Sequence, residues 1–134
     1  MDTHTVTLRT GSRPGTHDIT AALIEFCSSR ADGLVNVFVP HATAALAIIE
    51  VGAGSDHDLI ETMDRLVPRD ERWSHRHGSP GHGADHLLPA LLSPSIVLPV
   101  IGGRPALGEW QSVVLVDLNV DKPDRQVIFS HLTG

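Results

Sequence analysis

Segments in which apolar and polar residues alternate cover most of the chain. Such alternation predicts a strand, because successive side chains of a strand point to opposite faces of its sheet. We predict strands over residues 3–9, 34–39, 45–50, 96–101, 112–118 and 125–131, and a shorter one that ends near Ile19. With about seven strands, and without the regular strand–helix alternation of a parallel sheet, the chain belongs to the α+β class.

Two other segments have the spacing of an amphipathic helix. The first begins with Thr20 as its N-cap and runs to about Arg30. The second begins with Ser55 as its N-cap and ends at Pro68. Their apolar residues recur at intervals of three and four, which places them on one buried face of each helix.

Residues 68–83 lack periodicity and are rich in glycine and histidine. An irregular segment of this length favours a functional loop over a simple connection. A short helix follows, for which Asp85 is the predicted N-cap, because Pro89 is tolerated only close to a helix start. His86 then lies in the first turn of that helix.

Composition narrows the class of protein. The 134 residues suit one domain, and the formal net charge of −6 leaves no basic surface for nucleic acid or an anionic membrane. No run of 18 apolar residues occurs, and the N-terminus lacks the pattern of a signal peptide. The single Cys27 excludes an intramolecular disulfide, so we expect a cytoplasmic protein.

Histidines are the most informative residues, since six of the nine fall between His41 and His86. His41 follows Pro40 at a predicted strand end, and Glu50 ends the next apolar strand. An imidazole and a carboxylate at neighbouring strand ends are candidates for acid–base catalysis or for metal ligands. Two capped strands with surface polar residues are the alternative.

Four further histidines lie within twelve residues, at positions 75, 77, 82 and 86. His82 and His86 have the i, i+4 spacing that places two imidazoles on one helical face, although no HExxH motif is present. Because glycines flank His77 and His82, we interpret these two as solvated loop residues. His75 and His86 are the stronger candidates.

A second glycine-rich region lies near the C-terminal strands. Gly102, Gly103 and Arg104 bring backbone N–H groups and a guanidinium together, as in many anion sites. Trp110 and Gln111 follow at the start of the next predicted strand. A plain hairpin turn and a core tryptophan are the alternatives.

Taken in order, these short motifs resemble the YjbQ family, whose members are also described as secondary thiamine-phosphate synthases. The matching segments are His41–Leu46, Glu50, Asp58, Trp73–His75, His86, Leu98–Val100, Gly103-Arg104 and Leu107–Gln111. Two departures are that HTTA of the family is HATA here, and that the asparagines flanking the family glutamate are Ile49 and Val51.

The resemblance implies a two-sheet β-sandwich with two or three flanking helices, assembled as a homotrimer. It also implies a pocket near the subunit contact that gathers the histidine, aspartate and glutamate positions. The activity credited to such proteins is a low thiamine-phosphate synthase activity, which joins a pyrimidine diphosphate to a thiazole phosphate.

We therefore interpret the chain as an enzyme that acts on a small phosphorylated molecule. The predicted catalytic residues are His41, Glu50, Asp58, His75 and His86. Of these, His41, His75 and His86 are the predicted ligands of a divalent ion such as Mg²⁺ or Zn²⁺. The predicted substrate-binding residues are Thr43, Arg104, Trp110 and Gln111. No organic cofactor is expected. A non-catalytic metal- or anion-binding trimer and a metal-assisted hydrolase are the alternatives.

Overall fold

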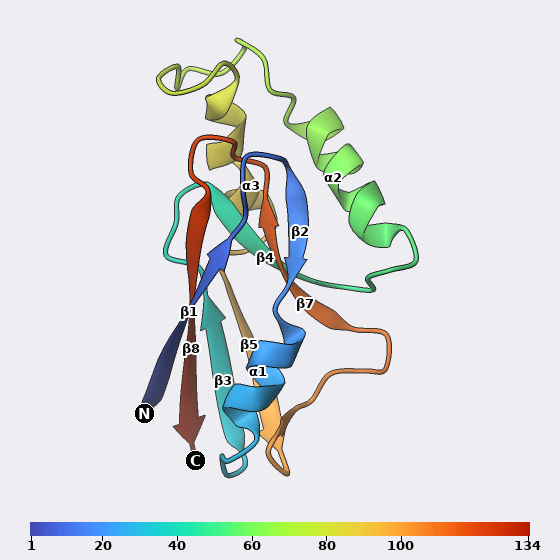
Figure 1. The fold of residues 1–134 in the computed structure, drawn as a ribbon, viewed down its shortest axis with the longest axis vertical. Helices are drawn as coiled ribbons and strands as arrows, with labels where there is room; N and C mark the ends of the chain where they lie inside the picture. The colour runs from blue at the N-terminus through green and yellow to red at the C-terminus, as the bar shows by residue number, and fades with distance from the viewer.

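The computed structural model covers residues 1–134 and contains two antiparallel sheets (Figure 1). The larger sheet has the strand order β1-β8-β3-β5-β6 and the smaller has the order β2-β7-β4. The strands are β1 (Asp2–Arg9), β2 (Gly15–Asp18), β3 (Gly33–Phe38), β4 (Ala44–Ile49), β5 (Ser95–Ile101), β6 (Arg104–Pro105), β7 (Ser112–Asp117) and β8 (Asp124–Thr133). The α+β class and the two-sheet arrangement are confirmed, with a two-residue strand, β6, beyond the seven predicted.

The smaller sheet is buried on both of its faces, which the continuous apolar run of β7 anticipates. Val113 and Leu115 point to the larger sheet and join the main core. Val114 and Val116 point the other way, into a second core. The molecule therefore has three layers: five strands, three strands, and helices.

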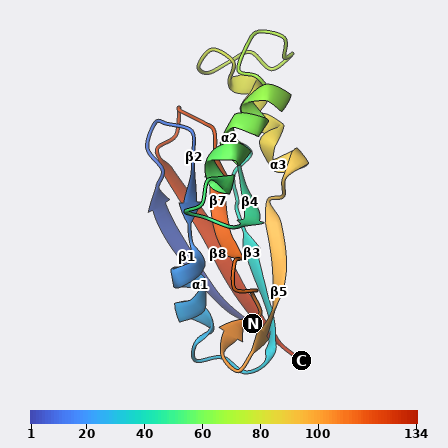
Figure 2. The same ribbon diagram turned by 90° about the vertical axis from the view of Figure 1, so that its right-hand side faces the viewer.

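Helices form the third layer and also close one end of the sandwich. Helix α1 (Thr20–Cys27) closes the main core below the smaller sheet, where the Phe26 ring lies 5.6 Å from the ring of Phe129. Helix α2 (Ser55–Leu66), the 3₁₀ helix η1 (His82–His86) and helix α3 (Leu88–Leu91) pack on the outer face of the smaller sheet (Figure 2). No helix is both long enough and apolar enough to span a membrane.

The opposite face of the larger sheet has no helix over it. Its exposed apolar side chains come from three neighbouring strands: Leu34, Phe38, Val97, Ile101 and Leu132. We call these five residues the open apolar face. Exposed apolar surface that is contiguous across strands is typical of an interaction site.

The helix starts differ from the predictions. Thr20 and Ser55 are the first helical residues, and the caps are Ile19 and Gly54. At α1 the carboxylate of Asp18 accepts the Thr20 N–H at 2.9 Å. A side chain two residues before the helix therefore provides the hydrogen-bond acceptor for its first N–H group. Asp85 does not cap α3, because its carboxylate is buried inside η1.

A buried polar network joins β7, β8 and the turn before β4. Arg125 and Asp117 are each about 1% exposed and are paired, with Arg125 Nε donating to Asp117 Oδ2 at 2.7 Å. Arg125 Nη2 and Asn119 Nδ2 both donate to the Thr43 hydroxyl, each at 2.9 Å. Paired and hydrogen-bonded in this way, the charges are compatible with burial.

Candidate metal centre

The loop between α2 and η1 is held in place by side chains. Trp73 Nε1 donates to the carbonyl of Pro68 at 2.8 Å, and the Arg69 guanidinium pairs with the fully buried Asp85. Gly81 has a φ of +78°, and a Cβ there would lie 2.4 Å from the Arg69 carbonyl carbon. A Cβ on Gly83 would lie 2.5 Å from the His75 carbonyl oxygen. Glycine is therefore required at both positions, where two parts of the loop touch.

Three imidazoles converge where this loop meets η1. One ring nitrogen from each of His75, His82 and His86 lies within 4.8 Å of the others. The Nε2 atoms of His82 and His86 are 3.1 Å apart. Two imidazole ligands of a tetrahedral zinc ion, with Zn–N bonds of about 2.0–2.1 Å, have nitrogens about 3.3 Å apart. The rings are thus spaced as metal ligands are.

Burial and charge favour the neutral, metal-binding form of the His86 imidazole. His82 is 8% exposed, and the other two rings are half-buried. Desolvation by burial lowers the pKa of His86, and the neighbouring imidazoles of His75 and His82 lower it further. His86 is therefore predominantly neutral at pH 7, the form that coordinates a metal.

Two of these rings hold polar atoms without an aligned partner. The Nδ1 atoms of His75 and His82 are buried and form no hydrogen bond. Leaving such atoms unpaired costs about 1–3 kcal/mol each. The Nδ1 atom of His82 nevertheless lies 3.0 Å from Asp121 Oδ2 and 3.4 Å from Asp85 Oδ2, within ion-pair distance of both. The unpaired, buried Nδ1 atom of His75 and the closely spaced Nε2 atoms of His82 and His86 are donors of the kind that a cation site contains, so these residues fit a metal ion.

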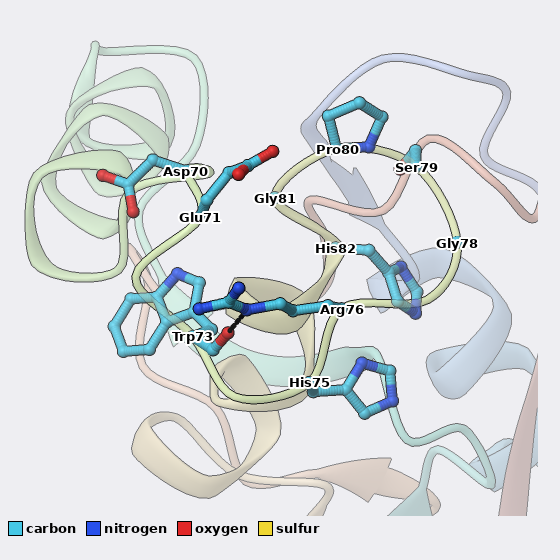
Figure 3. A pocket seen from close by; sticks show the side chains of 10 residues that line it. All are labelled: Asp70, Glu71, Trp73, His75, Arg76, Gly78, Ser79, Pro80, Gly81 and His82. Carbon is cyan, nitrogen blue, oxygen red and sulfur yellow. Dashed lines mark hydrogen bonds between the residues drawn. The ribbon is translucent and has the colours of Figure 1, made fainter.

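Two members of the cluster, His75 and His82, form part of the wall of a cavity of about 310 Å³. Figure 3 shows the loop circling this cavity, with the rings of His75 and His82 on the side opposite Trp73. Arg76 extends across the loop, and its Nε donates to the Trp73 carbonyl at 3.1 Å. Glu71 also lines the cavity. Basic, acidic and aromatic side chains therefore surround a small polar space beside the imidazoles.

His77 is close to the cluster but outside the group of three. Its ring centre lies 3.9 Å from that of His75, and the side chain is exposed. The prediction of a solvated residue agrees with this position.

His82 is the site residue that the sequence interpretation missed. The flanking glycines favour a solvated loop residue, yet in the structure they allow close approach of the chain, and the His82 ring is buried. The signal that pointed to it was the i, i+4 spacing with His86.

His41 lies in a different part of the chain from the three clustered histidines. It lines a cavity of about 250 Å³ with Lys122 and Arg125 among its walls. Its Nε2 accepts the Gln126 backbone N–H at 2.9 Å. Desolvation by burial lowers the pKa of His41, and the positive charges of Arg125 and Lys122 lower it further.

The predicted carboxylates and Thr43 also lie apart from the cluster within the single chain. Glu50 is exposed just after β4, and Asp58 is exposed in the first turn of α2. Thr43 is buried and is committed to the network with Arg125 and Asn119.

Arg104 and Gln111 share a third cavity, of about 360 Å³. The turn between β5 and β6 that leads into Arg104 lies at the lower end of Figure 1, whereas η1 lies near the upper end. Trp110 is 69% exposed and is not in the core. The structure thus brings together two of the predicted ligands, His75 and His86, and separately two of the predicted substrate-binding residues.

Comparison with known proteins places these features in a family. The sequence model of the family described as "UPF0047 protein YjbQ-like" matches residues 4–134. The chain belongs to the YjbQ family. A UPF0047 protein of Mycobacterium tuberculosis is 58% identical over 134 residues, the whole length of both chains. One of Archaeoglobus fulgidus is 37% identical over 123 residues, which is 92% of this chain and 96% of the other.

Two solved structures have the same fold. A hypothetical protein from Aeropyrum pernix superposes with a TM-score of 0.88 at 33% identity, with both chains fully covered. A YjbQ-like protein of unknown function from Sulfolobus solfataricus gives a TM-score of 0.92 at 23% identity, covering 99% of this chain and 97% of the other. The recognition of the family from short motifs is confirmed.

Proposed function

We propose that this YjbQ protein is a metal-dependent enzyme that acts on a small phosphorylated molecule. His75, His82 and His86 would hold a divalent ion, with zinc favoured by three imidazole ligands. The convergence of the three ring nitrogens within 4.8 Å, beside a polar cavity, carries this proposal. His82 replaces His41 in the predicted ligand set, because His41 lies in another cavity.

A divalent ion held there supplies a Lewis acid that stabilises negative charge developing on a leaving group. The protein's own residues bind and orient the substrate. Arg76 uses its Nε on the Trp73 carbonyl, which leaves its terminal N–H groups for a phosphate oxygen. The carboxylate of Glu71 is the acid–base candidate in the same cavity.

The first candidate reaction is the one that the family resemblance implies, the joining of a pyrimidine diphosphate to a thiazole phosphate. At about 310 Å³ the cavity is at the lower end of the roughly 300–1,000 Å³ range of ligand sites, so it suits one small molecule. A two-substrate reaction then needs a further wall, which a neighbouring copy of the chain would supply.

Hydrolysis of a phosphate ester is the second candidate function. It needs only one organic substrate, which matches the size of the cavity. A non-catalytic binding module is the rival class, and it would have all coordination positions of the ion filled by protein.

Assembly as a homotrimer is part of the proposal. The open apolar face of Leu34, Phe38, Val97, Ile101 and Leu132 is exposed in the single chain, and burying it would suit a permanent contact between copies. Cytoplasmic location is likewise proposed, on the basis of the single, buried and unpaired Cys27.

Metal binding and turnover test the proposal together. The protein is purified without a His tag, freed of metal, and titrated with Zn²⁺ at pH 7.5. It is then assayed with the pyrimidine and thiazole phosphates together, and with a simple phosphate monoester alone. We expect tight binding that is lost in His82→Ala, and turnover only in the metal-loaded protein. Binding no tighter than millimolar would remove the metal from the mechanism.

The products separate the candidates. Thiamine phosphate from the paired substrates supports the transferase, and inorganic phosphate from the monoester alone supports the hydrolase. Tight metal binding without either product supports the binding module and refutes the enzyme.

A further inference from the structure

The loop between β7 and β8 brings a carboxylate to the back of the histidine cluster, about forty residues away in the chain. Asp121 Oδ2 lies 3.0 Å from Nδ1 of His82, the ring nitrogen on the side away from His86. An imidazole that ligates a metal through one nitrogen almost always gives its other N–H to a carboxylate, a carbonyl or water. Asp121 stands where that partner is required.

We infer that Asp121 is a positioning residue that orients His82 for metal binding. This inference rests on the proposed metal centre. It concerns a residue that touches neither the substrate cavity nor the site of the ion. In that role the Nδ1–H of His82 would donate to Asp121 Oδ2, and Nε2, which faces His86, would bind the ion.

The Asp121 carboxylate is held in place from two directions. Ser79 donates to Oδ2 through its backbone N–H at 3.2 Å and through its hydroxyl at 2.9 Å. The backbone N–H of Asp121 donates to the Asn119 side chain at 2.7 Å. Asn119 in turn belongs to the buried network with Thr43. The carboxylate is therefore anchored before any metal arrives, although its side chain is 34% exposed.

Asp85 is the competing partner, because its Oδ2 lies 3.4 Å from the same nitrogen. Both of its oxygens already accept from Arg69. Asp121 has no guanidinium paired with it and is the nearer of the two. We assign the positioning role to Asp121 and a structural role to Asp85.

The experiment measures Zn²⁺ affinity of the full chain by competition with a chelating dye, together with the visible absorption spectrum of the Co²⁺ form. We expect Asp121→Asn to weaken Zn²⁺ binding by about 10- to 100-fold and to alter the Co²⁺ spectrum. Asparagine keeps the shape and the Ser79 contacts and removes the charge. Asp121→Glu should restore much of the affinity. The melting temperature of the metal-free variants should stay within about 2 °C of wild type, because the side chain is partly exposed.

Asp124→Asn is the matched control, since it removes the same charge three residues further on and that carboxylate touches none of the clustered histidines. It should leave affinity and spectrum unchanged. If His82→Ala loses Zn²⁺ and Asp121→Asn does not, the metal centre stands and this inference is wrong. Equal losses of Zn²⁺ affinity in Asp121→Asn and Asp124→Asn would mean that only net charge matters, and this result would also overturn the inference. A wild-type protein that binds no Zn²⁺ overturns both proposals.

Discussion

Breaking the Arg69–Asp85 pair should destabilise the fold and leave a pH signature. Asp85 is fully buried, whereas the Arg69 side chain is 19% exposed and keeps Ser79 and the Leu118 carbonyl as partners. Removing one member of a buried pair costs about 3–5 kcal/mol. Because the Arg69 side chain is partly exposed to solvent, we expect Asp85→Ala to lower the free energy of unfolding by about 3 kcal/mol. This loss would lower the melting temperature by roughly 10 °C. Arg69→Ala should cost more, since it strands the fully buried carboxylate.

The pH dependence of Arg69→Ala follows from the pKa of Asp85. Burial already raises that pKa, and Arg69 opposes the rise. A carboxyl group with a raised folded-state pKa contributes stability below its unfolded value of about 3.9, and this contribution is lost as pH rises through the folded value. Without Arg69 the pKa of Asp85 rises further. The stability deficit of Arg69→Ala relative to wild type should therefore grow between pH 4 and pH 8.

Urea unfolding of the wild type, Arg69→Ala, Asp85→Asn and the double variant at several pH values measures both effects. The Arg69→Ala deficit should be flat with pH in the Asp85→Asn background, which has no carboxyl to titrate. The sum of the losses in unfolding free energy of the two single variants should exceed the loss of the double variant by more than about 1 kcal/mol, as expected for residues in contact. A pH-independent deficit, or losses that simply add, would show that the pair is not coupled as described.

Three further predictions concern the site and the assembly. His75→Ala should abolish tight Zn²⁺ binding with little change in melting temperature, while His77→Ala should retain binding within about threefold; equal losses in a calorimetric titration would mean that the cluster is wrongly defined. The His41 imidazole should titrate below pH 6.5 by NMR, and Lys122→Ala should raise its midpoint, because a positive neighbour is removed; a midpoint above 6.5 in the wild type contradicts this. Light scattering should give about three times 14.4 kDa, and Val97→Lys on the open apolar face should give the monomer; a monomeric wild type at micromolar concentration rejects the trimer.

Much of the fold was predictable because alternation along a strand records which face is buried. The seven predicted strands lie within about two residues of the observed ones. Helix ends were less predictable, because neighbours outside the helix complete them. At α1 the Asp18 side chain takes the role assigned to Thr20, and at α2 a left-handed Gly54 precedes the predicted cap Ser55.

The candidate site was predictable only in part. His75 and His86 were identified from local spacing and from the resemblance, and they meet in the structure. The burial of His82 depends on contacts with Asp121 and on close packing at Gly83, which no local pattern encodes. The predicted pairing of His41 with Glu50 assumed that neighbouring strand ends share one cavity, and in the single chain they do not.

The anchoring by side chains of the loop between α2 and η1 has a consequence for how the family diversifies. No backbone hydrogen bond to another part of the protein fixes residues 71–78, and the sandwich core draws none of its buried side chains from them. Except at Trp73, which packs against the second core, substitutions there alter the cavity wall at little cost to folding. Under the proposed function, substrate preference could therefore change while the architecture persists, as it does in a solved structure that keeps this fold at 23% identity. Within the family, a shared fold is a poor guide to a shared substrate.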